Sequence, residues 1–218
     1  MKIKVLIPVR AGSERVKNKN IKPFAGSNLL AIKIQQMNGI EDIEGVIVNS
    51  NSDEMLELAS KLGAETVKRD EYYATSSVSM NEVYKNMAEN CNCDVILFAD
   101  ATNPLVTKKT ICKCIKSYKE NLDKYDSLTT VNEIKQFMWQ NGKPINYDKN
   151  NKPRSQDLPD IVALNHAISI IPRELMIRNK DIIGNKPQLY KISSLEATDI
   201  DTELDFEFAE YMYKKYRL

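Results

Sequence analysis

Short apolar runs alternate with amphipathic stretches through the first half of the chain, and this rhythm constrains the fold more than any other feature. The runs cover residues 3–9, 45–48, 65–67 and 95–98, and the amphipathic stretches lie near 28–38, 52–62, 77–90 and 108–122. Strands that alternate with helices build βαβ units around a mostly parallel sheet. The sequence therefore predicts a three-layer α/β/α fold with a Rossmann-like sheet, whose ligands bind at the carboxyl ends of the strands.

The rhythm changes after about residue 126. Strand-like runs follow at 127–131, 137–140 and 161–171, and a polar stretch at 146–157 separates the last two. This pattern predicts a β arm inserted at about 132–165, and a disordered loop is the alternative.

Residues 202–216 have the periodicity of a packed terminal helix. A chain of 218 residues fits one domain, so residues 1–218 are expected to form one unit.

The overall charge is nearly balanced, with 31 Lys and Arg against 30 Asp and Glu. This balance gives no reason to expect a nucleic acid or a membrane as partner. The first apolar run meets Pro8 and Arg10 before it is long enough for a signal sequence, and no run approaches transmembrane length. We therefore expect a cytoplasmic protein that holds any anionic ligand with a local cluster of charge.

Four cysteines stand in two C-x-C pairs, Cys91 with Cys93 and Cys112 with Cys114. Two such pairs raise the question of a structural zinc ion. The second pair falls in a predicted helix, where residues two apart point in different directions and chelate poorly. Reduced thiols in a reducing compartment are therefore the favoured interpretation.

Positive charge is concentrated in the loop after the first predicted strand. Residues 8–20 read Pro-Val-Arg-Ala-Gly-Ser-Glu-Arg-Val-Lys-Asn-Lys-Asn. Small residues let backbone N–H groups approach an anion, and neighbouring cations offset the charge of a polyphosphate. The spacing matches neither the P-loop nor the dinucleotide-binding fingerprint. A triphosphate site is the hypothesis, and a solvated basic surface is the alternative.

Four segments, in order, resemble the acylneuraminate cytidylyltransferase family, the enzymes that make CMP-sialic acid and related CMP-sugars. Residues 7–21 resemble its opening signature, and 98–105 (FADATNPL) resemble its turn after a strand. Residues 152–159 (KPRSQDLP) resemble its arm, and 199–205 (DIDTELD) resemble its metal motif. The resemblance implies a fold of the nucleotide-diphospho-sugar transferase type and Mg²⁺-dependent transfer of CMP from CTP to an acidic sugar. It also implies a homodimer in which the arm crosses into the partner subunit.

The resemblance assigns roles to matching positions. It implies catalytic roles for Arg10, Lys19 and Asp201. The implied nucleotide-binding residues are Arg10, Ala11, Gly12, Ser13, Lys19, Asn20 and Arg69.

The implied Mg²⁺ ligands are Asp199 and Asp201. Residues two apart in an extended segment point the same way, so both carboxylates can reach one cation. Alternatively, the pair caps the terminal helix. Asp100 stands where sialic-acid-activating members tend to carry Gln, whereas octulosonic-acid-activating relatives carry a metal-binding Asp. It is therefore either a third metal ligand or a turn-forming residue.

The acceptor sugar is the least constrained part of this prediction. The candidate substrate-binding residues are Asp100, Thr102, Arg154, Gln156, Asn165 and His166. Residues 163–169 lack the Arg common in the family, and Val106 also replaces a common Arg, which disfavours N-acetylneuraminic acid itself. His166 is either a pocket residue or a packing residue.

We expect a nonulosonic acid related to sialic, legionaminic or pseudaminic acid as acceptor. Transfer to an octulosonic acid or a phosphonate is the alternative. A non-catalytic nucleotide-binding protein is a third hypothesis.

Overall fold

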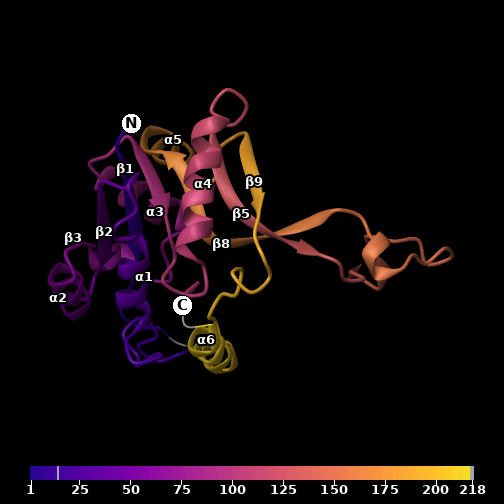
Figure 1. Ribbon diagram of the computed structural model, residues 1–218, viewed down its shortest axis with the longest axis horizontal. Helices are drawn as coiled ribbons and strands as arrows, with labels where there is room; N and C mark the ends of the chain where they lie inside the picture. The colour runs from indigo at the N-terminus through magenta and orange to yellow at the C-terminus, as the bar shows by residue number, and fades with distance from the viewer. Residues whose placement is uncertain (14, 217–218) are drawn as a thin grey trace.

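The computed structural model describes residues 1–13 and 15–216, and its body surrounds a seven-stranded sheet of order β3-β2-β1-β4-β8-β5-β9. Parallel pairs join β1 (Ile3–Pro8) to β2 (Gly45–Ser50) and to β4 (Val95–Phe98), and β2 to β3 (Glu65–Lys68). The long strand β8 (Ile161–Pro172) runs antiparallel to β4 and to β5 (Ser127–Ile134), and β9 (Pro187–Lys191) is parallel to β5. The predicted α/β fold with a mostly parallel sheet is confirmed (Figure 1).

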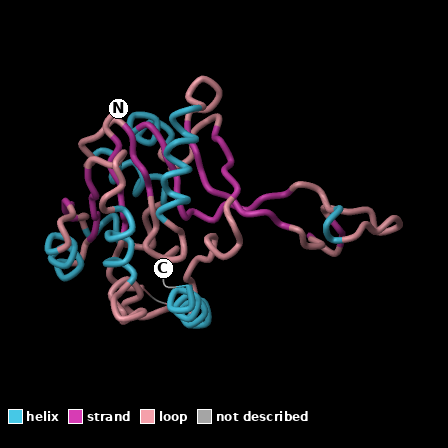
Figure 2. Tube along the Cα trace, viewed as in Figure 1, coloured by secondary structure: helices cyan, strands magenta, loops and turns pink. Residues whose placement is uncertain are grey.

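Helices cover both faces of this sheet (Figures 1 and 2). Successive residues of β1 point to opposite faces, so Val5 and Ile7 join one apolar core and Leu6 joins the other. The first core receives side chains from α1, α2, α4 and α6, and the second from α3 and α5. The helices are α1 (Leu29–Met37), α2 (Asp53–Lys61), α3 (Met80–Glu89), α4 (Lys108–Glu120), α5 (Arg173–Asn179) and α6 (Glu203–Tyr216).

The strand order reverses beside β1. The chain runs outward from β1 to β2 and β3, and then returns to place β4 on the other side of β1. In open α/β sheets, the crevice outside the carboxyl ends of the strands at such a reversal is the usual ligand site. The residues that follow β1 and β4, including Arg10 and Asp100, lie at this crevice.

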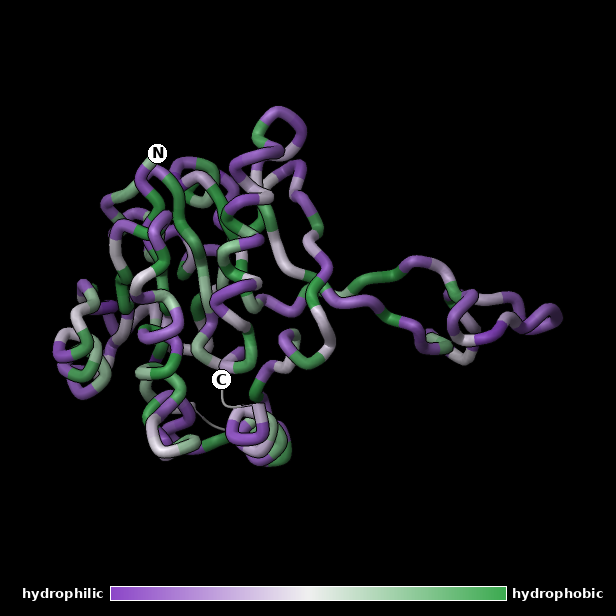
Figure 3. Tube along the Cα trace, in the orientation of Figure 1, coloured by the Kyte–Doolittle hydropathy of each residue, from purple (hydrophilic) through white to green (hydrophobic). Residues whose placement is uncertain are grey.

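The segment between β5 and β8 extends away from the body as an arm (Figure 1). It contains a small antiparallel pair, β6 (Trp139–Gln140) and β7 (Lys143–Pro144), and the 3-10 turn η2 (Ser155–Asp157). Asn146 accepts from the Met138 amide and donates to the Gln136 carbonyl, both at 2.8 Å, which ties the arm to itself. Hydrophobic residues are concentrated in the body, whereas the tip of the arm is mostly hydrophilic (Figure 3).

Several elements differ from the sequence expectations. The strand expected at 137–140 is reduced to the two residues of β6, and neither α5 nor β9 is predicted by the sequence pattern. β9 is an edge strand with no fully buried residue, so its sequence lacks the apolar run that marks the inner strands. Among the described residues, no helix combines the length and the apolar character needed to cross a bilayer.

Candidate active site

Two cavities adjoin at the carboxyl ends of β1 and β4, and Arg10 and Asp100 line both. The first has a volume of about 360 Å³, lies against α3 and includes Arg69 in its wall; we call it the Arg69 cavity. The second has a volume of about 280 Å³, lies beneath the loop after β1 and includes Lys19; we call it the Lys19 cavity. The two cavities therefore occupy the crevice at which the strand order reverses.

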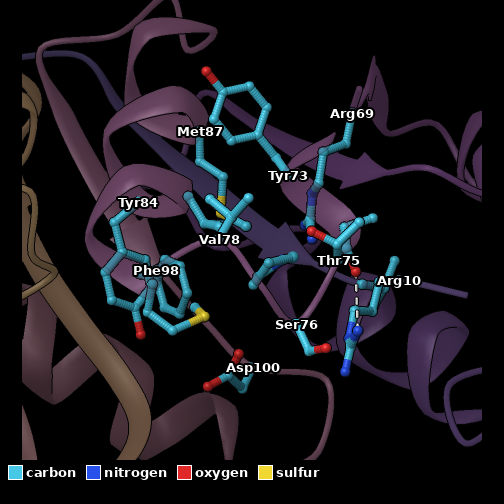
Figure 4. Close-up of a pocket in the computed structure, with 15 residues that line it drawn as sticks. Arg10, Arg69, Tyr73, Thr75, Ser76, Val78, Tyr84, Met87, Phe98 and Asp100 are labelled. Carbon is cyan, nitrogen blue, oxygen red and sulfur yellow. Dashed lines mark hydrogen bonds between the residues drawn. The ribbon is translucent and has the colours of Figure 1, made fainter. Parts of the chain in front are cut away.

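The Arg69 cavity has one apolar side and one polar side (Figure 4). Tyr84 of α3 and Phe98 of β4 pack edge to face on the apolar side, with ring centroids 5.6 Å apart. Apolar walls with a few convergent polar groups are typical of small-molecule sites. The remaining apolar lining includes Val78, Val83 and Met87, and the polar side consists of Arg10, Arg69, Thr75, Ser76 and Asp100.

Arg69 is held firmly although it is almost completely buried, with 5% of its surface exposed. Its Nε donates to Asn49 Oδ1 at 2.6 Å, and its Nη2 donates to the Asn49 carbonyl at 3.0 Å. Burial lowers the pKa of Arg69 to about 10, and the nearby charge of Arg10 acts in the same direction. Two guanidinium groups that repel each other at one cavity favour the binding of an anion between them.

The loop after β1 is fastened to the body at its beginning. Arg10 donates from Nη1 to the carbonyl of Ala74 at 3.0 Å, and the Ala11 amide donates to Asn51 Oδ1 at 3.0 Å. The amide of Ala11, a predicted nucleotide-binding residue, is therefore already occupied by Asn51. Gly12 has a φ of +79°, a conformation that L side chains rarely adopt.

Among the described residues, the amides of Gly12 and Ser13 donate to no other group of the chain. Ser13 also lines the Lys19 cavity. These two amides thus remain suited to an anion.

The far end of the same loop meets the segment before α6. Arg15 donates to Asp201 Oδ1 at 2.8 Å, and the Lys19 ammonium lies 3.8 Å from the same oxygen. Lys19 also donates to the carbonyl of Ile200, and Asn20, 6% exposed, lines the Lys19 cavity. The predicted basic loop and the predicted acidic pair therefore meet at one site.

The Asp100 carboxylate has both acidic and basic neighbours. Burial raises the pKa of Asp100 to about 7, and Asp199 raises it as well, whereas Lys33 and Lys19 act in the opposite direction. Desolvation also raises the pKa of Asp199, and Asp201 contributes in the same direction, against the Thr102 hydroxyl and Lys19. The carboxylates of Asp100 and Asp199 are thus close enough that ionisation of one disfavours ionisation of the other. A bound cation would relieve this repulsion.

The acidic pair does not cap the terminal helix. Thr202 Oγ1 accepts from the Asp205 amide at 3.2 Å, and Asp205 Oδ2 accepts from the amides of Asp201 and Thr202 at 3.1 and 2.7 Å. This reciprocal pattern is a capping box built from Thr202 and Asp205. The side chains of Asp199 and Asp201 are therefore free of the capping role that was the alternative.

Not every predicted substrate residue lies at the two cavities. Thr102 lines the Lys19 cavity and accepts the Ile200 amide through its carbonyl at 3.0 Å. Arg154 and Gln156 lie on the exposed arm, where Arg154 donates to Asp157 at 2.8 Å. Within one chain, the arm projects away from the body (Figure 1), and neither Arg154 nor Gln156 lines either cavity.

Asn165 and His166 of β8 also lie outside both cavity linings. Asn165 is 7% exposed and accepts from the Thr130 hydroxyl at 2.7 Å, which is the contact pattern of a residue that orders the strand. His166 is exposed and has a φ of +54°, next to an irregularity in the β5–β8 pairing. Because His166 is exposed and lines neither cavity, it is neither a pocket residue of this chain nor a packing residue, the two alternatives for this position.

Sequence reasoning missed two groups that help to form the site. The first is the segment 73–78 with Tyr84, which supplies much of the Arg69 cavity; its run of small polar residues before a helix was the available signal. The second is Lys33, a lysine in the apolar helix α1 with 0% of its surface exposed. The only sequence signal for Lys33 was a charged residue between Ile32 and Ile34.

The described part of the chain contains no group of three or more His, Cys, Asp or Glu side chains arranged to hold a metal ion. Asp100, Asp199 and Asp201 are therefore neighbours rather than a ready three-carboxylate centre, because Asp201 is turned to Arg15. The four cysteines are free thiols; Cys91 and Cys114 are buried, whereas Cys112 is exposed.

Comparison with known proteins gives a consistent result. The family model described as cytidylyltransferase matches residues 4–216. Post-translational flagellin modification protein B of Campylobacter coli is 26% identical, and the match covers 97% of this chain and 95% of that protein. Pseudaminic acid cytidylyltransferase of Campylobacter jejuni is 27% identical, over 98% of this chain and 97% of that protein.

A solved structure shares the fold. CMP:2-keto-3-deoxy-manno-octonic acid synthetase complexed with CTP superimposes with a TM-score of 0.71 at 11% identity. The superposition covers 99% of this chain and 100% of that chain. At this sequence identity, the structural similarity shows a shared fold and nothing more.

Proposed function

The chain belongs to the cytidylyltransferase family, and from this premise we propose that it transfers CMP from CTP to an acidic sugar and releases pyrophosphate. The proposed acceptor is a nonulosonic acid of the sialic, legionaminic or pseudaminic acid class, and the proposed cofactor is Mg²⁺. The single observation that carries the proposal is the meeting of the basic loop with the acidic segment, joined by Arg15 and Asp201 at 2.8 Å, beside a second cavity with an apolar wall.

The two cavities suggest how CTP is divided between them. A pyrimidine nucleoside suits the Arg69 cavity, because its aromatic and aliphatic wall offers the base a packing surface and its polar side offers hydrogen bonds. The triphosphate suits the Lys19 cavity, where Arg15 and Lys19 supply positive charge and Ser13 lines the wall. Arg10 lines both cavities, so it is placed to contact the phosphate nearest the nucleoside.

The acidic residues fit a magnesium ion of the kind that shares its ligands with a nucleotide. Mg²⁺ usually keeps several waters and takes one or two carboxylates together with substrate phosphates. Asp100 and Asp199 repel each other electrostatically, so a cation between them would relieve an unfavourable arrangement that the fold already maintains. Asp201 is the further candidate ligand, provided that Arg15 turns toward the phosphates. When bound, the ion would neutralise charge on the phosphate oxygens.

The reaction is a displacement at the α-phosphorus of CTP. A hydroxyl oxygen of the acceptor gives up its proton to water or to an anionic group of the substrates and forms the new P–O bond, and the bond from the α-phosphorus to the bridging oxygen breaks as pyrophosphate leaves. Arg10, Arg15 and Lys19 stabilise the negative charge that develops on the phosphate oxygens. The chain contributes mainly by positioning the reactants and by offsetting charge.

The proposal includes a homodimer, because two of the candidate substrate-binding residues, Arg154 and Gln156, lie on the arm. The arm projects away from the body of its own chain (Figure 1), and Arg154 pairs there only with the neighbouring Asp157 among the described residues. An arm that reaches the site of a partner subunit would bring Arg154 and Gln156 to the acceptor. An exposed Arg is suited to bind a carboxylate in a bidentate manner.

Pyrophosphate release tests the function directly. The protein is incubated with CTP and Mg²⁺ and with one acceptor at a time: pseudaminic, legionaminic or N-acetylneuraminic acid, an octulosonic acid, and an aminoalkylphosphonate. We expect pyrophosphate and a CMP-sugar with at least one nonulosonic acid, and none with UTP in place of CTP. Turnover only with the octulosonic acid or the phosphonate would overturn the acceptor class. CTP binding without release in any reaction would favour a non-catalytic binding protein.

A further inference from the structure

Lys33 is an unusual residue in helix α1, because the whole side chain is removed from solvent at 0% exposure. Its neighbours in the helix, Ile32 and Ile34, belong to the main apolar core. Burial of an amine is unfavourable unless hydrogen bonds or an opposite charge offset the loss of water. Burial lowers the pKa of Lys33 to about 7, and the charge of Asp100 raises it, so the two groups lie within electrostatic range.

The Lys33 amine is directed at the turn that follows β4. Its Nζ donates to the carbonyl of Asn103 at 2.9 Å. The backbone amide of Asn103 donates in turn to the Asp100 carbonyl at 3.4 Å, which closes the turn from Asp100 to Asn103. Lys33 therefore stabilises the turn that carries the Asp100 carboxylate.

Asn103 extends this support to two other segments. Its side-chain nitrogen donates to the carbonyl of Thr198 at 3.1 Å and to the carbonyl of Asn165 at 3.4 Å. Thr198 directly precedes Asp199, so one buried residue links the turn of Asp100, strand β8 and the start of the acidic segment. Asn103 is 0% exposed, and the contacts are thus shielded from competition by water.

We propose that Lys33 is a positioning residue for the transfer reaction: by anchoring Asn103, it fixes the Asp100 carboxylate and the segment of Asp199 relative to each other. This inference rests on the proposed function, because it assigns to Lys33 the geometry of the acidic side of that same site. Lys33 itself touches neither cavity, since it appears in the lining of neither.

Helix α1 offers a matched control. Gln36 lies three residues after Lys33 and donates to the carbonyl of Pro104 at 2.6 Å, the residue that follows Asn103. It makes the same kind of contact from the same helix, but the Pro104 carbonyl is not bonded to the segments of Asp100 or Asp199. The variants to compare are Lys33→Met and Gln36→Leu, each with a side chain of similar size.

We expect Lys33→Met to lower kcat by about 10- to 100-fold, the scale of a misplacement near 1 Å at a reacting centre. The Mg²⁺ concentration for half-maximal rate should rise several-fold, while the affinity for CTP measured in EDTA should stay within about 3-fold of the wild type. As a readout independent of turnover, the rise in Tm that Mg²⁺ causes at saturating CTP should shrink. Gln36→Leu should leave all four quantities nearly unchanged.

A folded Lys33→Met protein with the kcat and the Mg²⁺ response of the wild type would overturn the inference, as would an equal loss in Gln36→Leu. If Lys33→Met does not fold, Lys33→Gln decides instead, because its side-chain amide can still donate a hydrogen bond and it is expected to lose less activity in the same direction. Additional evidence comes from the double variant with Asp100→Asn, in which Lys33→Met should cause a smaller loss than in the wild type, because only the segment of Asp199 then remains to be positioned. Additive losses would contradict positioning.

Wild-type protein that releases no pyrophosphate would refute the proposed function, whereas an active wild type with an unaffected Lys33→Met would refute this inference alone.

Discussion

The guanidinium of Arg15 lies 2.8 Å from the carboxylate of Asp201, although 186 positions of sequence separate them. This contact joins the basic loop after β1 to the acidic segment before α6. Had the two clusters been far apart, the hypothesis of a nucleotide site would have failed. The pair also gives Asp201 a counter-charge before any ligand binds, so a triphosphate that attracts Arg15 would free Asp201 for a cation.

Arg10→Ala should lower kcat/KM for CTP by about 10- to 100-fold, because Arg10 lines both cavities and supplies a charge to the phosphates. Lys17→Ala is the control, since Lys17 is exposed on the same loop and lines neither cavity. Initial rates of pyrophosphate release measure both variants. Full activity of Arg10→Ala, or an equal loss in both, would exclude the proposed role of Arg10.

Asp201→Asn should reduce turnover by about 100-fold or more, because it removes a carboxylate of the proposed metal site. Its thermal stability should change little, because the Arg15 pair is exposed and such pairs contribute little. Glu203→Gln removes a neighbouring exposed ion pair with Lys22 and should remain active. A variant Asp201→Asn with unchanged turnover at limiting Mg²⁺ would show that the carboxylate is not needed.

Phe24→Ala should destabilise the fold by about 3–5 kcal/mol, the usual cost of removing a buried aromatic ring. Phe24 is 0% exposed and packs edge to face on Phe206 and Tyr213 of α6, with centroids 5.3 and 5.6 Å apart. Chemical denaturation monitored by circular dichroism gives the free energy of unfolding. Tyr211→Ala on the exposed side of the same helix should cost far less, and equal losses would contradict this packing.

The sequence was sufficient for the parallel half of the fold, because β1, β2 and β4 are apolar runs separated by amphipathic helices. It was not sufficient for β9, an edge strand without a fully buried residue. Edge strands have part of their surface in water, so they need no apolar run. The short helix α5 gave too few turns to show a period.

For the site, residues adjacent in sequence to the strand ends were found, and those brought in by tertiary packing were not. Arg10 and Asp100 follow β1 and β4, so topology alone places them at the crevice. Tyr84 enters the Arg69 cavity through the packing of α3 on the sheet, which no local pattern specifies. The exposed position of His166 could not be foreseen, because the pairing of β5 with β8 shifts register around it and no local pattern marks this shift.

The stability of the metal-free protein should depend on pH through Asp100. Its pKa is about 7 in the fold and 3.8 for the free side chain, so the folded state holds a proton that the unfolded state has lost between these values. Stability from this group is therefore present at low pH and is lost as the pH rises toward 7. The free energy of unfolding of Asp100→Asn, taken relative to that of the wild type, should therefore rise as the pH increases from 4 to 6.5, by on the order of 2 kcal/mol.

Denaturation in EDTA at several pH values measures this difference. The buffer series should include Asp126→Asn, whose carboxylate accepts the amides of Asn185 and Lys186 at the opposite end of the sheet. A stability difference between Asp100→Asn and the wild type that stays constant over this range would show that Asp100 ionises normally.

A crystal structure with CTP and Mg²⁺ tests the account most directly. We predict the base in the Arg69 cavity, the phosphates between Arg10 and Lys19, and the ion bound to the phosphates and at least one of Asp100, Asp199 and Asp201. A nucleotide bound elsewhere, or phosphates in the Lys19 cavity with the ion remote from all three carboxylates, would contradict the account.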